Sequence, residues 1–86
     1  MFRVLPGVLW RAEGGGALVY DRQGDAVFDG NRPALLVLER LDGRATIGDI
    51  ASELTRCFTI TPEAALADVA AFVAEMCELG LAERLS

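Results

Sequence analysis

The sequence contains no histidine, the side chain that most often acts as a general base or a metal ligand. Its two cysteines, Cys57 and Cys77, lie among apolar neighbours on separate predicted helices. We therefore expect buried free thiols, with a disulfide or a redox role as the alternatives. Acidic pairs such as Asp25 with Asp29 have the spacing of a solvated surface. The sequence thus predicts no catalytic residue, no metal site and no cofactor, and an enzyme that acts alone is not expected.

The chain also lacks lysine, and no arginine occurs from residue 57 to residue 83. That stretch contains the strongest helical pattern, the last of three in an order like that of a helix-turn-helix. A helix that reads DNA normally brings cations to the phosphates, whereas this one carries Glu63, Asp68, Glu75 and Glu78. The net charge of −5 agrees with this. The charges argue against nucleic acid and anionic membranes as partners and favour an apolar or cationic peptide or protein.

Long hydrophobic runs are absent too. The longest apolar stretch is interrupted by Glu39, Arg40 and Asp42, and falls short of the roughly 18 residues that a membrane span needs. The first six residues lack the charged start and long apolar core of a signal peptide, so we expect a cytoplasmic protein. At 86 residues the chain is expected to form a single domain over residues 1–86.

Three short strands are predicted in the first third of the chain. Gly24 favours a tight turn after Asp21, and the glycine run at 14–16 is typical of a hairpin loop. That run lacks the lysine and hydroxyl residue of a phosphate-binding loop, and no helix follows it. The expected strands are Val8–Arg11, Ala17–Tyr20 and Asp25–Asp29.

Three helices are predicted in the remainder of the chain. Asn31 is a good N-cap before Pro33, and Thr46 caps a second apolar pattern. Thr61 begins the third helix, which continues to Leu79 and stops at a glycine. Strands followed by helices predict an α+β domain of winged-helix type, with a three-stranded antiparallel sheet followed by three helices.

The third predicted helix has more apolar surface than a one-sided surface helix needs, because its apolar arc covers roughly 180°. One part of the arc is expected to dock on the first two helices: Leu66, Val69, Ala70, Val73 and Cys77. The far edge consists of Phe72, Met76 and Leu79, with Ala65 and Asp68 nearby. Either the strands cover this edge, or a groove lined by Phe72 and Met76 remains beside the outer strand.

The third predicted strand suits such a groove. An edge strand exposes unpaired N–H and C=O groups, and the carboxylates of Asp25 and Asp29 on either side of Val27 guard against aggregation. A partner peptide that adds itself as a further strand would gain main-chain hydrogen bonds. Its alternate side chains would then meet Phe72 and Met76.

The sequence resembles the PqqD family, whose members recognise the precursors of ribosomally synthesised and post-translationally modified peptides (RiPPs). The run Leu36–Leu54 carries most of the resemblance, together with Ala17–Asp21. The helix that starts at Thr61–Pro62–Glu63 and ends at Leu79–Gly80–Leu81 also agrees. The resemblance covers nearly the whole chain and rests mostly on caps, turns and core positions.

This resemblance implies a non-catalytic, winged-helix-like recognition element. Such a domain binds the leader segment of a precursor peptide as an extra strand, in the groove between the third strand and the third helix. It presents the precursor to a modifying enzyme, often a radical S-adenosylmethionine enzyme, or to a leader peptidase in lasso-peptide pathways. The implied site residues are Asp25, Ala26, Val27, Phe28, Asp29, Ala65, Asp68, Val69, Phe72 and Met76.

The sequence departs from the family pattern where the third strand meets the first helix. A Leu-Asn pair is usual there, and here Asn31 follows Gly30 instead. Arg32–Pro33 likewise replaces the common Pro-Thr, so the end of the binding strand is expected to be looser than usual. The stretch from Leu41 to Leu54 leans toward the radical-enzyme type of pathway.

Two alternatives to a recognition element stay open. One is a winged-helix DNA-binding regulator, which would need the basic strip that the third helix lacks. The other is a scaffold in which the same strand edge pairs with a second copy, so both a monomer and a swapped or edge-paired dimer are compatible with the sequence. Trp10 is expected to be part of the core rather than a contact for the partner.

Overall fold

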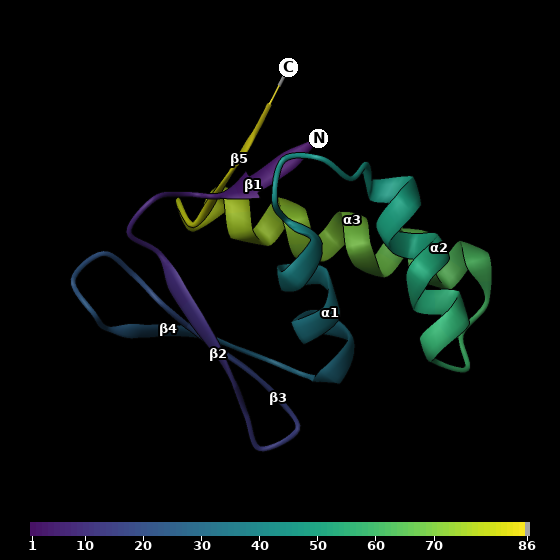
Figure 1. The fold of residues 1–86 in the computed structure, drawn as a ribbon, viewed down its shortest axis with the longest axis horizontal. Helices are drawn as coiled ribbons and strands as arrows, with labels where there is room; N and C mark the ends of the chain where they lie inside the picture. Colours follow the sequence, from purple (N-terminus) through teal and green to yellow (C-terminus); the bar gives the residue numbers. More distant parts are fainter. Residues whose placement is uncertain (86) are drawn as a thin grey trace.

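The computed structural model describes residues 1–85 and contains one sheet of three antiparallel strands beside three helices (Figure 1). The predicted α+β architecture is therefore confirmed, and the predicted strand ends differ from the observed ones by at most two residues. The sheet has the order β2–β3–β4, so β2 and β4 are its edges. Its strands are β2 (Leu9–Glu13), β3 (Gly16–Tyr20) and β4 (Ala26–Gly30), and the helices are α1 (Arg32–Arg40), α2 (Ile47–Cys57) and α3 (Pro62–Glu78).

A second, two-stranded sheet was not predicted. β1 (Phe2–Val4) pairs antiparallel with β5 (Ala82–Arg84), and the Val4 N–H also donates to the Leu41 carbonyl at 3.2 Å. Each strand has only three residues, which is too short to show an alternating pattern. This pair ties the N-terminal segment to the ends of α1 and α3, and both termini lie on the same side of the molecule (Figure 1).

The three helix starts agree with the predicted caps. Asn31 Oδ1 accepts the Ala34 N–H at 3.1 Å, and the Thr61 hydroxyl accepts the Ala64 N–H at 3.2 Å. Thr46 and Asp49 form a reciprocal capping box at the start of α2. Caps of this kind satisfy helix N–H groups that have no partner within the helix, which explains why local sequence located the helices well.

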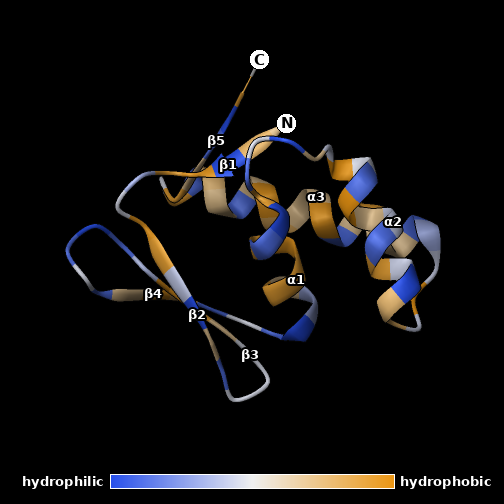
Figure 2. Ribbon diagram, in the orientation of Figure 1, coloured by the Kyte–Doolittle hydropathy of each residue, from blue (hydrophilic) through white to orange (hydrophobic). Residues whose placement is uncertain are grey.

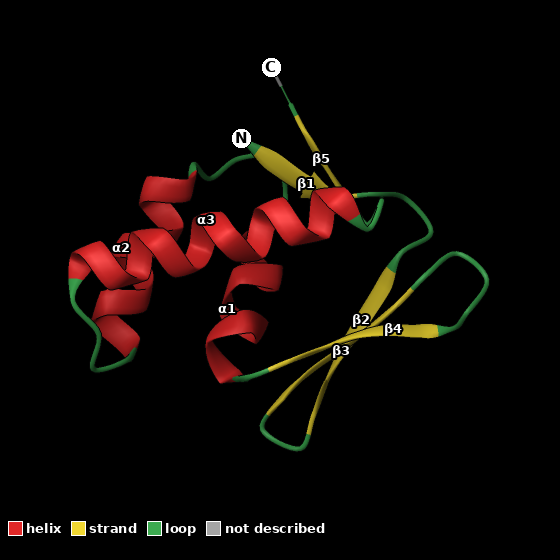
Figure 3. Cartoon of the chain, turned by 180° about the vertical axis from the view of Figure 1, so that it is seen from behind, coloured by secondary structure: helices red, strands yellow, loops and turns green. Residues whose placement is uncertain are grey.

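Helix α3 forms the centre of the core. Seen from behind in Figure 3, it crosses α1 and α2 and ends beside the β1–β5 pair, while the sheet lies to one side. Hydrophobic residues dominate much of α3 and the middle of α1, whereas the turn between β3 and β4 is hydrophilic (Figure 2). The largest fully buried side chains are Val19, Ile50, Leu54, Val69, Val73 and Met76.

The predicted division of the apolar arc of α3 was wrong in part. Ala65 and Met76, placed at the far edge, are fully buried, whereas Leu66 and Ala70, expected to dock on the other helices, are exposed. The buried residues follow the spacing i, i+4, i+8, i+11, a narrower stripe than the arc drawn from hydrophobicity alone. The flanking alanines of α3 broaden the apparent arc although they are exposed: Ala64, Ala67, Ala70, Ala71 and Ala74.

Both cysteines are free, but only one is partly buried. Cys57 is exposed because it is the last residue of α2, so its predicted burial was wrong. Cys77 is half-buried, and removal from water raises the pKa of its thiol. Trp10 packs partly buried against the core, as predicted. Within residues 1–85, no helix is long and apolar enough to cross a membrane.

Candidate functional site

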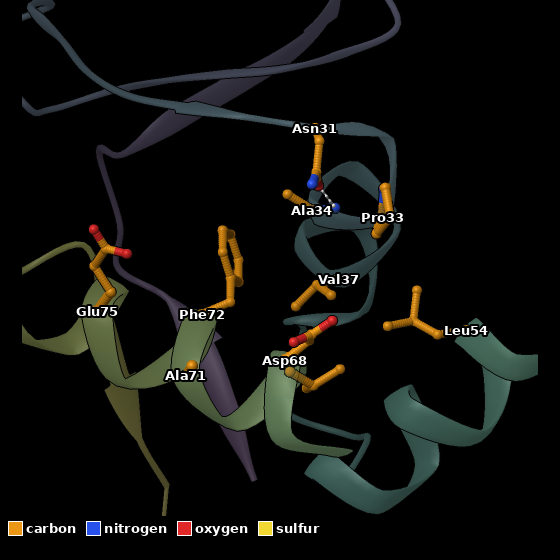
Figure 4. Close-up of a pocket in the computed structure, with 10 residues that line it drawn as sticks. Asn31, Pro33, Ala34, Val37, Leu54, Asp68, Ala71, Phe72 and Glu75 are labelled. Atoms are coloured by element: carbon orange, nitrogen blue, oxygen red, sulfur yellow. Dashed lines mark hydrogen bonds between the residues drawn. The ribbon is translucent and has the colours of Figure 1, made fainter. Parts of the chain in front are cut away.

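A hollow of about 360 Å³ opens between the start of α1 and the outer face of α3 (Figure 4). Phe72 projects from α3 toward the start of α1, and Asp68 and Glu75 stand on either side of it. We call this hollow, with the adjoining edge of β4, the α1–α3 groove. The residues that line the hollow are Asn31, Pro33, Ala34, Val37, Leu54, Asp68, Val69, Ala71, Phe72 and Glu75.

The edge strand β4 leads directly into this groove. Its last residue is Gly30, and Asn31 both caps α1 and lines the hollow. An edge strand directs alternate N–H and C=O groups away from its neighbour, and within residues 1–85 the one strand that pairs with β4 is β3. The outward main-chain groups of β4 therefore lie next to the side-chain pocket.

The register of β4 determines which of its side chains face the helices. Phe28 lies opposite the fully buried Val19, so it points to the helical side of the sheet, and its ring meets Phe72 edge-on with centroids 5.3 Å apart. Asp29 lies opposite Leu18 and therefore belongs to the other face. Val27 has no partner in β3, because it is the extra residue of a β-bulge.

The groove combines an apolar floor with an acidic rim. Val37, Leu54 and Val69 are buried and form the floor, while Asp68 and Glu75 are exposed at the rim. The ion pairs found within residues 1–85 involve neither rim carboxylate. Those pairs are Arg3–Glu83, Arg11–Glu13 and Arg40–Glu53. Such a surface can hold an apolar side chain, or a cation with a long aliphatic stem.

The structure distributes the predicted site residues over four environments: the hollow, the edge strand, the β3–β4 turn and the core. Phe28, Asp68 and Phe72 lie at the groove, and Ala26, Val27 and Asp29 lie on the edge strand. Asp25 precedes β4 and belongs to the β3–β4 turn, where its N–H donates to Asp21 Oδ1 at 3.0 Å. Ala65, Val69 and Met76 are fully buried, and of these three only Val69 lines the hollow.

Sequence reasoning placed the groove between two elements and missed the contribution of α1. Asn31, Pro33, Ala34 and Val37 form one wall, with Leu54 of α2 at its end. One available signal was the absence of any linker between the third strand and the Asn31 cap. Because the strand ends where the helix begins, a groove beside the strand must also border the first turn of that helix.

Close packing explains why a glycine precedes Asn31. A Cβ atom at Gly30 would lie 2.6 Å from the Ala34 Cβ atom, and one at Gly16 would lie 2.0 Å from the Gly30 carbonyl oxygen. A leucine at position 30 would therefore require α1 to move relative to the sheet. The sequence departs from the family pattern at a point where backbone and helix approach closely.

Comparison with known proteins assigns the family. The model of Coenzyme PQQ synthesis protein D (PqqD) matches residues 16–82, which include β4, α1 and α3. The chain belongs to the PqqD family. The predicted resemblance is thereby confirmed, and the matched segment contains every residue that lines the α1–α3 groove. Among curated proteins, no sequence matches this PqqD-family chain.

Three solved structures share the fold of this PqqD-family chain. A lasso peptide synthetase B1 complexed with the leader peptide is 27% identical, covers 96% of this chain and 98% of its own, and has a TM-score of 0.80. The PqqD truncation of Methylobacterium extorquens PqqCD, a functional and stand-alone RiPP recognition element, is 26% identical, with coverages of 96% and 88% and a TM-score of 0.79. TbiB1 in complex with the TbiA(beta) leader peptide is 11% identical, with coverages of 98% and 98% and a TM-score of 0.81, and shows the fold alone.

Proposed function

We propose that this protein is a non-catalytic recognition element that binds the leader segment of a ribosomal precursor peptide. The observation that carries the proposal is the open edge of β4 running directly into the α1–α3 groove. The lasso peptide synthetase B1 relative is complexed with a leader peptide, and the Methylobacterium relative is a stand-alone recognition element. Both relatives are matched over nearly the whole chain.

Strand addition at β4 accounts for both affinity and specificity. A peptide strand would lie about 4.8 Å from β4 and form main-chain hydrogen bonds with its outward groups. Every second side chain of that peptide would face α3, where Phe72 and the hollow can receive an apolar or long-stemmed residue. In this arrangement Val27 and Phe28 of β4 and Asp68 and Phe72 of α3 form the binding site.

The bound precursor would then be presented to a modifying enzyme, either a radical S-adenosylmethionine enzyme or a leader peptidase. The domain itself would contribute recognition, in line with its similarity to the stand-alone recognition element from Methylobacterium extorquens. We place this function in the cytoplasm, where both thiols would stay reduced.

The decisive experiment is a titration with the synthetic leader of the precursor encoded beside this protein. Amide shifts in the NMR spectrum are expected in β4, in the first turn of α1 and on the outer face of α3. Single N-methylation along the leader should weaken binding at alternate positions, because only every second peptide N–H of an added strand points to β4.

The outcome also separates the alternatives. Uniform effects of N-methylation would reject strand addition, and an unchanged NMR spectrum would reject recognition of this leader. A concentration-dependent dimer whose β4 amides are protected without leader would favour the self-pairing scaffold. The same edge cannot pair with a second copy and with a leader at once.

A further inference from the structure

We propose that the α1–α3 groove selects a basic leader segment, in which a lysine or arginine lays its aliphatic stem on the apolar floor and brings its charge to Asp68 or Glu75. This inference rests on the proposed function and specifies the chemistry of the peptide. Both carboxylates are exposed at the hollow, within one turn of Phe72 on either side. A cation beside an apolar contact at Phe72 therefore meets negative charge whichever direction the chain takes.

Among the described residues 1–85, no arginine forms an ion pair with Asp68 or Glu75. None of the eight arginines lines the hollow, and α3 contains no basic residue. Arg32 follows the lining residue Asn31 in sequence, but its stem lies within 4 Å of a Cβ atom built at Gly15, toward the β2–β3 turn. The rim carboxylates are thus available to a partner's charge.

The N–H groups of residues 33–35 at the start of α1 do not provide an anion site that would offset the rim. Helix N-termini attract anions through N–H groups that have no partner in the helix. Here Pro33 has no N–H, and the Ala34 N–H donates to the Asn31 side chain. The Leu35 N–H donates to the Asn31 carbonyl at 3.2 Å. At residues 33–35 the donors are thus absent or occupied, and the formal charges that line the hollow are the two carboxylates, so the groove favours positive charge.

The floor suits the stem of a cationic side chain. Val37, Leu54 and Val69 supply buried aliphatic surface, and the volume of about 360 Å³ has room for a long side chain. Lysine and arginine bury their methylene groups along such surfaces while the charged head stays at the wet rim. A shorter aliphatic residue would fill the floor and leave both carboxylates unpaired.

The test measures the affinity of the fluorescein-labelled leader for wild-type protein and for the Asp68→Asn, Glu75→Gln double variant. An exposed ion pair contributes about 1.5- to 5-fold, and the double variant removes whichever carboxylate pairs with the cation, so it should bind about 1.5- to 5-fold more weakly. The matched control is Glu39→Gln with Glu78→Gln, which removes the same net charge at exposed positions outside the hollow. This control should bind as the wild type does.

A second arm replaces each leader lysine or arginine in turn by norleucine, which keeps the stem and removes the charge. The substitution at the contacting position should weaken binding to the wild type and have little effect on the double variant. If the wild type binds and the double variant binds equally well or more tightly, the basic-leader inference is overturned and leader recognition stands. If the wild type does not bind the leader at all, both the recognition function and this inference fail.

Discussion

At the scale of single residues, Phe72 decides the shape of the candidate site. It is the large side chain of α3 that stands between the hollow and β4, half-buried against Phe28 and half-open to a partner. A residue in this position can contribute to binding without being indispensable for folding. Its neighbours Val69, Val73 and Met76 are fully buried and cannot be altered without changing the core.

We expect Phe72→Ala to weaken leader binding at least tenfold, because the substitution removes the aromatic wall of the groove. The free energy of unfolding should fall by about 1 to 2 kcal/mol, less than for a fully buried phenylalanine. Urea denaturation and fluorescence anisotropy measure the two effects. The control is Leu66→Ala. Leu66 is 49% exposed on α3 and lies outside the hollow, so this substitution should leave leader binding unchanged.

The two thiols should differ in reactivity. Burial raises the pKa of the Cys77 thiol, so at pH 8 a smaller fraction of it is the reactive thiolate. We expect iodoacetamide to modify the exposed Cys57 first, with mass spectrometry locating the label. In 8 M urea the two alkylation rates should converge, because unfolding exposes both thiols. A faster reaction at Cys77 than at Cys57 in the folded protein would contradict the burial of the Cys77 thiol.

At the scale of elements, β4 is an edge strand that contains a β-bulge. The bulge at Val27 increases the local twist and interrupts the register with β3, a common way of discouraging uncontrolled pairing. The strand is nevertheless followed at once by Asn31 and α1, so the part beyond the bulge keeps a fixed position against the helix. A partner strand would meet a twisted edge anchored at one end.

Val27→Pro tests this edge directly. Proline removes one N–H from the edge, so leader affinity should fall by about 3- to 10-fold if that group bonds the added strand. Val27→Thr keeps the N–H and the branched shape and should bind almost as the wild type does. Thermal melting of both variants checks the fold, and equal affinity of a folded Val27→Pro variant would count against strand addition here.

The helices were predictable from sequence because their signals are local. Asn31, Thr46 and Thr61 each act within one turn, and all three caps are where the sequence placed them. The β1–β5 pair was not predictable, since Phe2 finds its partner Arg84 only after the whole domain has folded. Helical periodicity predicted that α3 exists. It also predicted an apolar arc that was too wide to distinguish the buried residues of α3 from its exposed flanks.

The candidate site divides in the same way. Asp68 and Phe72 follow from helix periodicity, and an exposed edge follows from the strand count. The wall formed by α1 depends on how closely the helix approaches the sheet, which the contact of Gly30 with Ala34 sets. The burial of Met76 depends on the rotation of α3 about its axis, which packing partners determine and composition does not.

At the scale of the whole molecule, the N-terminal segment holds the ends of two helices. Phe2, Val4 and Leu5 pack partly buried on the core, and main-chain bonds join this segment to Leu41 and Leu81. The α1–α3 groove contains no residue from this segment. The N-terminal segment therefore contributes to stability without lining the groove.

Deletion of residues 1–4 should lower the free energy of unfolding by about 2 to 3 kcal/mol, through loss of partly buried apolar surface and of the β1–β5 hydrogen bonds. Leader affinity of the folded fraction should change less than twofold. Chemical denaturation gives the first value and anisotropy at low temperature the second. A large loss of affinity in fully folded protein would mean that this segment shapes the groove after all.

The antiparallel register of β1 with β5 has a consequence for protein architecture. The Leu85 N–H donates to the Met1 carbonyl at 2.7 Å, so the chain enters and leaves the domain at one place. Such a domain can be spliced as a cassette into a loop of another protein, or circularly permuted through a short linker and reopened at the Gly14–Gly15 turn. In either arrangement β4, α1 and α3 keep their connectivity. The leader-binding site could therefore be transferred to another protein together with the domain.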